Sequence, residues 1–178
     1  MRIYTRKGDD GTTGLLYGGR SSKASPRVEA VGAVDEAQAA IGVARPEVDG
    51  EVDAILVRVC HDLYVCMAEL ATLPENRSKL EPGKQLVTAE MVEALEPIID
   101  EAMGRFAMPT DFVIPGGTRA AALLDVARTV VRRAERDTLS VAAPGSFVVP
   151  YLNRLSDLLW ALARAQEGGD HVLSKEIR

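Results

Sequence analysis

Apolar side chains recur at helical spacing along most of this chain, and prolines and glycines separate the helical stretches from one another. Val31, Val34 and Ile41 lie three and seven residues apart, which places them on one face of a helix. The same spacing recurs near the C-terminus in four leucines: Leu152, Leu155, Leu159 and Leu162. No alternating pattern of useful length predicts a strand. The sequence therefore favours an all-α bundle.

Prolines and capping residues mark the expected ends of five helices. Ser25 followed by Pro26 is typical of an N-cap and a first helical position, and Pro46 and Pro74 close the first two helices. Thr88 is expected to cap the third. The predicted helices cover residues 26–45, 52–73, 88–106, 118–140 and 150–166. Between and after them we expect a surface loop at 75–87, a non-helical apolar segment at 112–117 and a frayed polar tail after residue 168.

The composition suits one domain with an aliphatic core. The chain has 178 residues, of which only 4% are aromatic, so the core must consist mainly of leucine, valine, isoleucine and alanine. A formal net charge of −5 argues against non-specific binding to nucleic acid. We find neither a signal peptide nor an apolar run near the ~20 residues that a membrane span requires. We therefore expect a cytoplasmic protein, with Cys60 and Cys66 as small buried side chains.

The first 24 residues differ from the rest because they are polar, rich in glycine and crowded with hydrogen-bond donors. Gly8, Gly11 and Gly14 permit positive φ angles and close backbone approach. Hydroxyls and cations accompany these glycines: Thr5, Arg6, Lys7, Thr12 and Thr13. Asp9 and Asp10 are candidates to hold a hydrated Mg²⁺. Together these groups predict a phosphate-binding segment.

The predicted helix 118–140 carries a basic row in which Arg128, Arg132 and Arg136 repeat every four residues. One interpretation is a solvated face whose arginines pair with nearby acids: Asp125, Glu135 and Asp137. The other is that Arg128 and Arg132 border a packed face, because small apolar residues interleave with them, and that they need a fixed anionic partner. The periodicity leaves both interpretations open.

Two further polar residues lie beside apolar helix faces. Asp35 follows Val34, and Asn153 follows Leu152. Each is either an ordinary polar flank of a helix or a functional group. Several common sites are excluded, because the chain has no nucleotide P-loop, no dinucleotide fingerprint, no nucleophile elbow and no pair of Glu-x-x-His motifs. The remaining possibility is an anion-binding site formed by the N-terminal segment and the arginines.

Five sequence blocks resemble the propanediol-utilisation-type (PduO-type) ATP:cob(I)alamin adenosyltransferases. In chain order they are Tyr4–Thr13, Lys23 with Arg27–Glu36, Phe112–Thr118, Val126–Arg136 and Tyr151–Leu159. The blocks keep the family's order and span almost the whole chain, which makes chance a poor explanation. Lys7 departs from the pattern, because the family commonly has a small hydroxyl residue at this position.

The resemblance implies a ferritin-like five-helix bundle, with a four-helix up-and-down core plus one helix, in a single domain over residues 1–178. Its parts would be a nucleotide-binding segment (1–24), the bundle (25–168) and a polar tail (169–178). The resemblance further implies a homotrimer with active sites between subunits. The reaction would transfer the 5′-deoxyadenosyl group from ATP, with Mg²⁺, to reduced cobalamin and release triphosphate. A corrinoid reductase and an adenosylcobalamin-dependent enzyme are implied as partners.

The resemblance also assigns roles to individual residues. It implies nucleotide contacts for Thr5, Arg6, Lys7, Gly8, Asp9, Thr12, Thr13, Lys23, Glu29, Arg132, Arg133, Ala134, Glu135, Arg136 and Asn153. Phe112, Arg132, Asp35 and Arg128 would form the catalytic set. Within it, Asp35 and Arg128 would pair across the subunit interface, and Phe112 would press under the corrin ring and exclude the lower axial ligand. The protein ligands of the metal stay unassigned.

The alternative function is that of a binding protein, a trimeric helical carrier or sensor that binds ATP or a corrinoid without turnover. For either function we expect the N-terminal segment to be disordered without nucleotide and ordered with it.

Overall fold

The computed structural model describes residues 3–169 and 171–176. Six α-helices occur in these residues: α1 (Pro26–Ala44), α2 (Gly50–Leu70), α3 (Ala89–Glu93), α4 (Glu96–Met103), α5 (Arg119–Thr138) and α6 (Val148–Ala165). Short elements complete the regular structure: β1 (Thr12–Gly14), β2 (Arg20–Ser22), and the 3₁₀ helices η1 (Arg45–Glu47), η2 (Pro74–Lys79) and η3 (Ser174–Glu176). The prediction of a helical bundle is confirmed, and the small β1–β2 hairpin is an addition to it.

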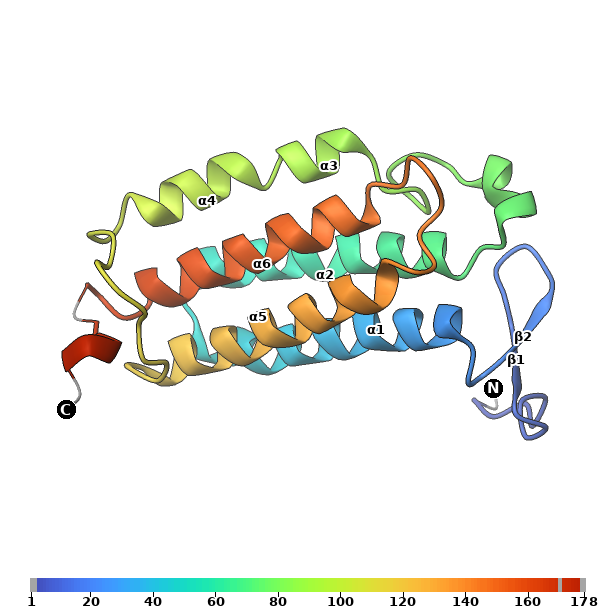
Figure 1. Ribbon diagram of the computed structural model, residues 1–178, viewed down its shortest axis with the longest axis horizontal. Helices are drawn as coiled ribbons and strands as arrows, with labels where there is room; N and C mark the ends of the chain where they lie inside the picture. The colour runs from blue at the N-terminus through green and yellow to red at the C-terminus, as the bar shows by residue number, and fades with distance from the viewer. Residues whose placement is uncertain (1–2, 170, 177–178) are drawn as a thin grey trace.

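The four long helices α1, α2, α5 and α6 run side by side, and α3 and α4 follow one another along the outside of this bundle (Figure 1). The β1–β2 hairpin lies at one end, with the start of α1 and the end of α5. The connection between α4 and α5 and the C-terminal residues lie at the other end. Helix α5 therefore links the two ends. Among residues 3–169 and 171–176, no helix is long and apolar enough to cross a membrane.

Side-chain caps begin the helices close to where the sequence predicts them. The side chains of Ser25, Thr88 and Thr118 each accept a hydrogen bond from the backbone N–H three residues on. Asp49 caps α2 in the same way at 2.9 Å. Helix α2 therefore begins at Gly50 and ends at Leu70, slightly earlier at both ends than predicted.

The prediction of one continuous helix over 88–106 is wrong, because this stretch is divided into α3 and α4. Pro97 lies at the start of α4 and explains the division. Proline lacks the N–H that would donate to the carbonyl of Glu93, and its ring clashes with that carbonyl in a regular helix. Helix α3 accordingly ends at Glu93.

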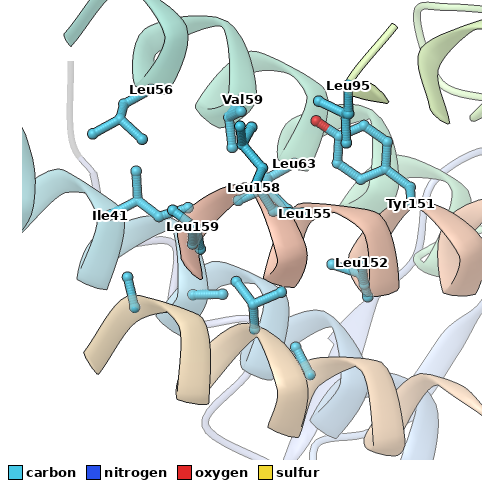
Figure 2. Packing of buried hydrophobic residues seen from close by; sticks show 14 of the residues in the cluster. Ile41, Leu56, Val59, Leu63, Leu95, Tyr151, Leu152, Leu155, Leu158 and Leu159 are labelled. Atoms are coloured by element: carbon cyan, nitrogen blue, oxygen red, sulfur yellow. The ribbon is translucent and has the colours of Figure 1, made fainter. Parts of the chain in front are cut away.

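The core consists mainly of aliphatic side chains, as the low aromatic content predicts. Leu152, Leu155 and Leu159 of α6 are completely buried. Figure 2 shows them in one cluster with Ile41 of α1 and Leu56 of α2. The face of α6 that the sequence marks as apolar therefore packs at the centre of the bundle.

The segment 74–87 is anchored to the bundle rather than loose on its surface. The buried carboxylate of Glu69 accepts hydrogen bonds from the Arg77 guanidinium (2.5 Å), the Val87 N–H (2.8 Å) and the Ser146 hydroxyl (2.6 Å). One carboxylate thus holds two separate connections together at the hairpin end of α2.

Candidate active site

The N-terminal segment folds into a loop that an antiparallel hairpin closes. In this hairpin Thr12 pairs with Ser22, and Gly14 pairs with Arg20. Arg6 and Gly11 adopt positive φ angles of 59° and 81°. A positive φ is uncommon for arginine, and such residues cluster at functional sites. The predicted phosphate-binding segment therefore has a defined and partly strained backbone.

Arg20 holds this loop together, and the sequence interpretation missed it. Its guanidinium donates to the Lys7 carbonyl oxygen at 2.6 Å and, through Nε, to Thr12 Oγ1 at 2.9 Å. The Thr12 hydroxyl in turn donates to Asp10 Oδ1 at 2.8 Å. The only signal in the sequence was an arginine within a run of small residues. The Thr12 hydroxyl, which is predicted to contact nucleotide, makes hydrogen bonds within the loop in this structure.

Asp10 also makes contacts within the loop. Its carboxylate accepts hydrogen bonds from the hydroxyl and backbone N–H of Thr12 and lies 3.5 Å from Arg20 Nη2. These hydrogen bonds lower the pKa of Asp10. Within the part of the chain that the structure describes, no group of three or more His, Cys, Asp or Glu side chains could hold a metal ion. The suggestion that Asp9 and Asp10 hold a hydrated Mg²⁺ needs only two carboxylates, and it stays a prediction.

Lys23 crosses the same loop beside Gly8. A Cβ atom added to Gly8 would lie 3.1 Å from the Thr12 carbonyl oxygen and 3.2 Å from Lys23 Nζ. Glycine at position 8 therefore permits the close approach of the lysine ammonium. Three predicted nucleotide-binding residues, Gly8, Thr12 and Lys23, are brought together here.

We expect Arg20→Ala to weaken ATP binding by about tenfold, because the variant loses the hydrogen bonds that close the loop and ATP must then order it. Isothermal titration calorimetry would measure the change. Arg45→Ala is a matched control, since Arg45 is another partly exposed arginine paired with a carboxylate, Asp53. Equal ATP affinity in the Arg20 and Arg45 variants would contradict a role for Arg20 in the binding loop.

The arginines of α5 differ in their partners. Arg133 pairs with Glu36 of α1, and this contact raises the pKa of Arg133 and lowers that of Glu36. Arg136 Nη1 donates to the carbonyl oxygen of Arg132 at 2.9 Å. The guanidinium of Arg132 is exposed and has no partner among residues 3–169 and 171–176. Arg132 is therefore a cation available to a ligand.

The other predicted residues of this helix face in different directions. The side chain of Ala134 is completely buried in the core. Glu135 lies at the border with α6 and accepts a hydrogen bond from Asn153 Nδ2 at 3.0 Å. Asn153 and Glu135 are thus neighbours across two helices, as a shared site requires.

A surface hollow of about 380 Å³ lies between the start of α1 and the end of α5. Glu29 and Arg136, both predicted nucleotide-binding residues, line it together with Ala24. Because Ala24 directly follows Lys23, this hollow adjoins the N-terminal loop. The structure therefore brings the N-terminal segment and the basic end of α5 to one end of the bundle.

A second hollow of about 530 Å³ lies toward the other end of α5. Phe112 and Arg128, two of the predicted catalytic residues, line it with Trp160 of α6. The Phe112 side chain is 84% exposed, which is exceptional for a phenylalanine. Arg128 Nε donates to Asp125 Oδ1 at 2.9 Å. Arg128 is mostly buried and pairs with a buried acid of its own helix. This agrees with the second interpretation of the basic row, in which an arginine at the border of a packed face has a fixed anionic partner.

Asp35 and Arg128 do not meet within one chain. Asp35 is exposed on α1 and lines an apolar hollow of about 510 Å³ with Val31, Tyr64 and Met67. Arg128 lies on the side of α5 that faces α6, next to Trp160. The predicted pair can therefore form only between chains.

The prediction of a frayed tail after residue 168 is wrong for residues 171–175. The Ile114 N–H donates to the Val172 carbonyl oxygen, and the Ser174 N–H donates to the Phe112 carbonyl oxygen, both at 2.8 Å. These residues thus continue the structure beside the Phe112 hollow. A polar composition gave no sign of these contacts, because they are made by backbone atoms.

Comparison with known proteins decides the family. The model of the cobalamin adenosyltransferase family matches residues 3–166. This chain belongs to that family. It is 42% identical over 175 residues to the corrinoid adenosyltransferase PduO of Salmonella typhimurium, covering 96% of the chain and 51% of that protein. The chain thus spans about half the length of this relative. A corrinoid adenosyltransferase of Mycobacterium tuberculosis is 42% identical over 179 residues, covering 97% of the chain and 92% of the relative.

Solved structures agree with the family assignment. A variant of the PduO-type ATP:corrinoid adenosyltransferase from Lactobacillus reuteri, complexed with cobalamin and ATP, superposes with a TM-score of 0.88 at 28% identity. The match covers 98% of this chain and 99% of that one. Another variant of the same enzyme, complexed with ATP, gives a TM-score of 0.82 at 30% identity and covers 93% of this chain and 94% of that one. The bundle and its hairpin end therefore have the architecture of this family.

Proposed function

We propose that this member of the family transfers the 5′-deoxyadenosyl group from ATP to the cobalt of cob(I)alamin. The observation that carries the proposal is the position of Arg132 between two hollows. Arg128 lines one and Arg136 the other, and each lies about 6 Å along the helix axis from Arg132. An unpartnered cation between a phosphate-binding end and an aromatic hollow suits a reaction that joins a nucleotide to a large planar cofactor.

The chemistry needs no catalytic base. The electron pair of Co(I) attacks C5′ of ATP, the C5′–O bond breaks, and its electrons leave on triphosphate. The protein must align the two substrates and stabilise the growing negative charge. Arg132 and Lys23 suit the second task, because neither has an acidic partner among the described residues. Mg²⁺ would arrive with the phosphates of ATP.

Phe112 supplies the apolar surface for the corrinoid. An exposed phenylalanine ring offers cobalt no donor atom, so a cobalt above it would have an empty lower face. Co(II) without an axial donor is easier to reduce to the nucleophilic Co(I). The exposure of Phe112 at the edge of a hollow is what this role requires.

We further propose that the active chain is a homotrimer in the cytoplasm, with each active site between two subunits. Asp35 and Arg128 face different sides of the chain, so their pair would join neighbours. The apolar surface around Asp35 supports such an interface. The pair would define the geometry of the interface more than its strength, since buried ion pairs often only break even. A reductase would supply Co(I), and an adenosylcobalamin-dependent enzyme would receive the product.

One assay tests the proposal. The purified chain with ATP, Mg²⁺ and chemically reduced cobalamin should form the carbon–cobalt bond, seen as the absorption spectrum of adenosylcobalamin, and release triphosphate. Release of ADP and orthophosphate would overturn the reaction. Binding of ATP and cobalamin without a carbon–cobalt bond would favour the alternative, a carrier or sensor.

A further inference from the structure

Residues 171–175, here called the clasp, run antiparallel to residues 110–114, here called the Phe112 loop. Val113 and Leu173 form the antiparallel bridge between them. The hydrogen bonds from Ile114 to Val172 and from Ser174 to Phe112 flank this bridge. Side chains add to it, because Lys175 Nζ donates to Thr110 Oγ1 at 2.8 Å. The clasp therefore holds the backbone from Phe112 to Ile114 and contacts a side chain on the other side of Phe112.

The clasp is itself fixed to α6 by buried contacts that run through Glu167, which follows that helix. His171 Nδ1 lies 2.8 Å from Glu167 Oε2, and the side chains are 5% and 1% exposed. Glu167 also lies 3.0 Å from Arg164 Nε, and Arg164 is only 2% exposed. On its other side His171 contacts the Phe106 ring edge-on, with centroids 5.6 Å apart. The acid Glu167 thus joins the clasp to a fixed cation in the bundle.

The same chain of charges reaches the Phe112 hollow. Arg164 Nη2 donates to Asp125 Oδ2 at 2.6 Å, and Asp125 accepts from Arg128, which lines the hollow. Gly117, three residues after the Phe112 loop, lies close to Glu167, because a Cβ atom added to Gly117 would lie 3.1 Å from Glu167 Cγ. Glu167 therefore contacts His171 of the clasp and Arg164 of the hollow, and it lies beside Gly117.

We propose that Glu167 and His171 are positioning residues that set the place of Phe112 through the clasp. The Phe112 ring is 84% exposed, so packing of its own side chain does not fix it. Its place depends on the backbone of the Phe112 loop, and the clasp holds that backbone. The consequence is that the clasp keeps the Phe112 ring under the corrinoid, and this consequence rests on the proposed function.

Two substitutions at one position separate the hydrogen bond from simple packing. His171→Leu keeps an apolar side chain against Phe106 but has no donor for Glu167. His171→Asn keeps an amide donor near the place of Nδ1. In ligand-free protein, residue-resolved hydrogen exchange of the Ile114 and Ser174 amides should be about tenfold faster in His171→Leu than in the unchanged chain. His171→Asn should restore most of the protection, and the melting temperatures of the variants should be similar.

The second measurement uses Co(II) cobalamin with ATP. Electron paramagnetic resonance distinguishes four-coordinate from five-coordinate Co(II), so it reports whether the lower face is empty. We expect His171→Leu to lose most of the four-coordinate species while ATP affinity stays within about twofold. His171→Asn should retain it, and Asp157→Asn, a change of an exposed acid on α6, should have no effect.

The two measurements fail in different ways. Unchanged amide exchange in His171→Leu would overturn the clasp. Faster exchange with an unchanged Co(II) spectrum would overturn its role in placing Phe112. If the unchanged chain binds no corrinoid, the proposed function fails and the consequence for Phe112 fails with it, whereas the exchange measurement still decides the clasp itself.

Discussion

Arg132→Ala should lower the rate of adenosyl transfer by about 100-fold, which is the usual effect of removing one fixed group that stabilises a developing negative charge. The guanidinium is exposed and unpartnered within the described residues, so its loss leaves no buried acid behind and should not change folding stability. ATP affinity should fall as well, by a smaller factor, because the charge on triphosphate grows in the transition state. Steady-state kinetics and calorimetric titration with ATP measure the two effects.

A matched control changes the net charge by the same amount. Arg58 is another exposed helical arginine, on α2, and it lines neither the Phe112 hollow nor the Glu29 hollow. Arg58→Ala should leave both the rate and the ATP affinity unchanged. Kinetics of Arg132→Ala indistinguishable from those of Arg58→Ala would remove Arg132 from the active site.

Phe112→Ala should also reduce turnover by about 100-fold when the assay starts from Co(II) cobalamin, as expected for loss of the group that positions the reacting centre. ATP affinity should stay the same, because the phosphate-binding segment lies at the opposite end of the bundle. Stability should change little, since the ring is 84% exposed and leaves no cavity when removed.

The control for this variant is Met108→Ala. Met108 is 65% exposed near the same loop, but it does not line the hollow. Starting the assay from chemically prepared Co(I) should reduce the defect of Phe112→Ala, because the reduction step is then bypassed. Equal losses of ATP binding and of turnover would contradict the role of Phe112 beneath cobalt.

Local patterns predicted most of the bundle. Ser25, Thr88 and Thr118 cap helices as expected, because a capping hydrogen bond depends only on residues three apart. The exception is Pro97, whose effect on the helix 88–106 was a local signal that the interpretation overlooked. The leucines of α6 lie in the core for the same local reason, namely their helical spacing.

The contacts that shape the candidate site could not be predicted in this way, because they join residues far apart in the chain. Arg20 closes the N-terminal loop through a backbone carbonyl, and the clasp holds residues 110–114 through backbone hydrogen bonds. Neither leaves a pattern in side-chain spacing. The basic row of Arg128, Arg132 and Arg136 is a clear spacing pattern, but the spacing did not reveal which arginine has a partner. Arg128 pairs with Asp125, Arg136 donates to a backbone carbonyl, and the guanidinium of Arg132 has no partner among the described residues.

Trp160 gives the molecule an optical property of its own. It is the only tryptophan in the chain, and it lines the Phe112 hollow beside Arg128. Its ring meets Phe106 edge-on at 5.9 Å, and Phe106 also meets His171 of the clasp. Corrinoids absorb in the near ultraviolet, where tryptophan emits, so energy transfer would quench its fluorescence. The intrinsic emission of this chain thus arises from one ring at the wall of the hollow, and an unlabelled sample carries its own reporter of corrinoid occupancy.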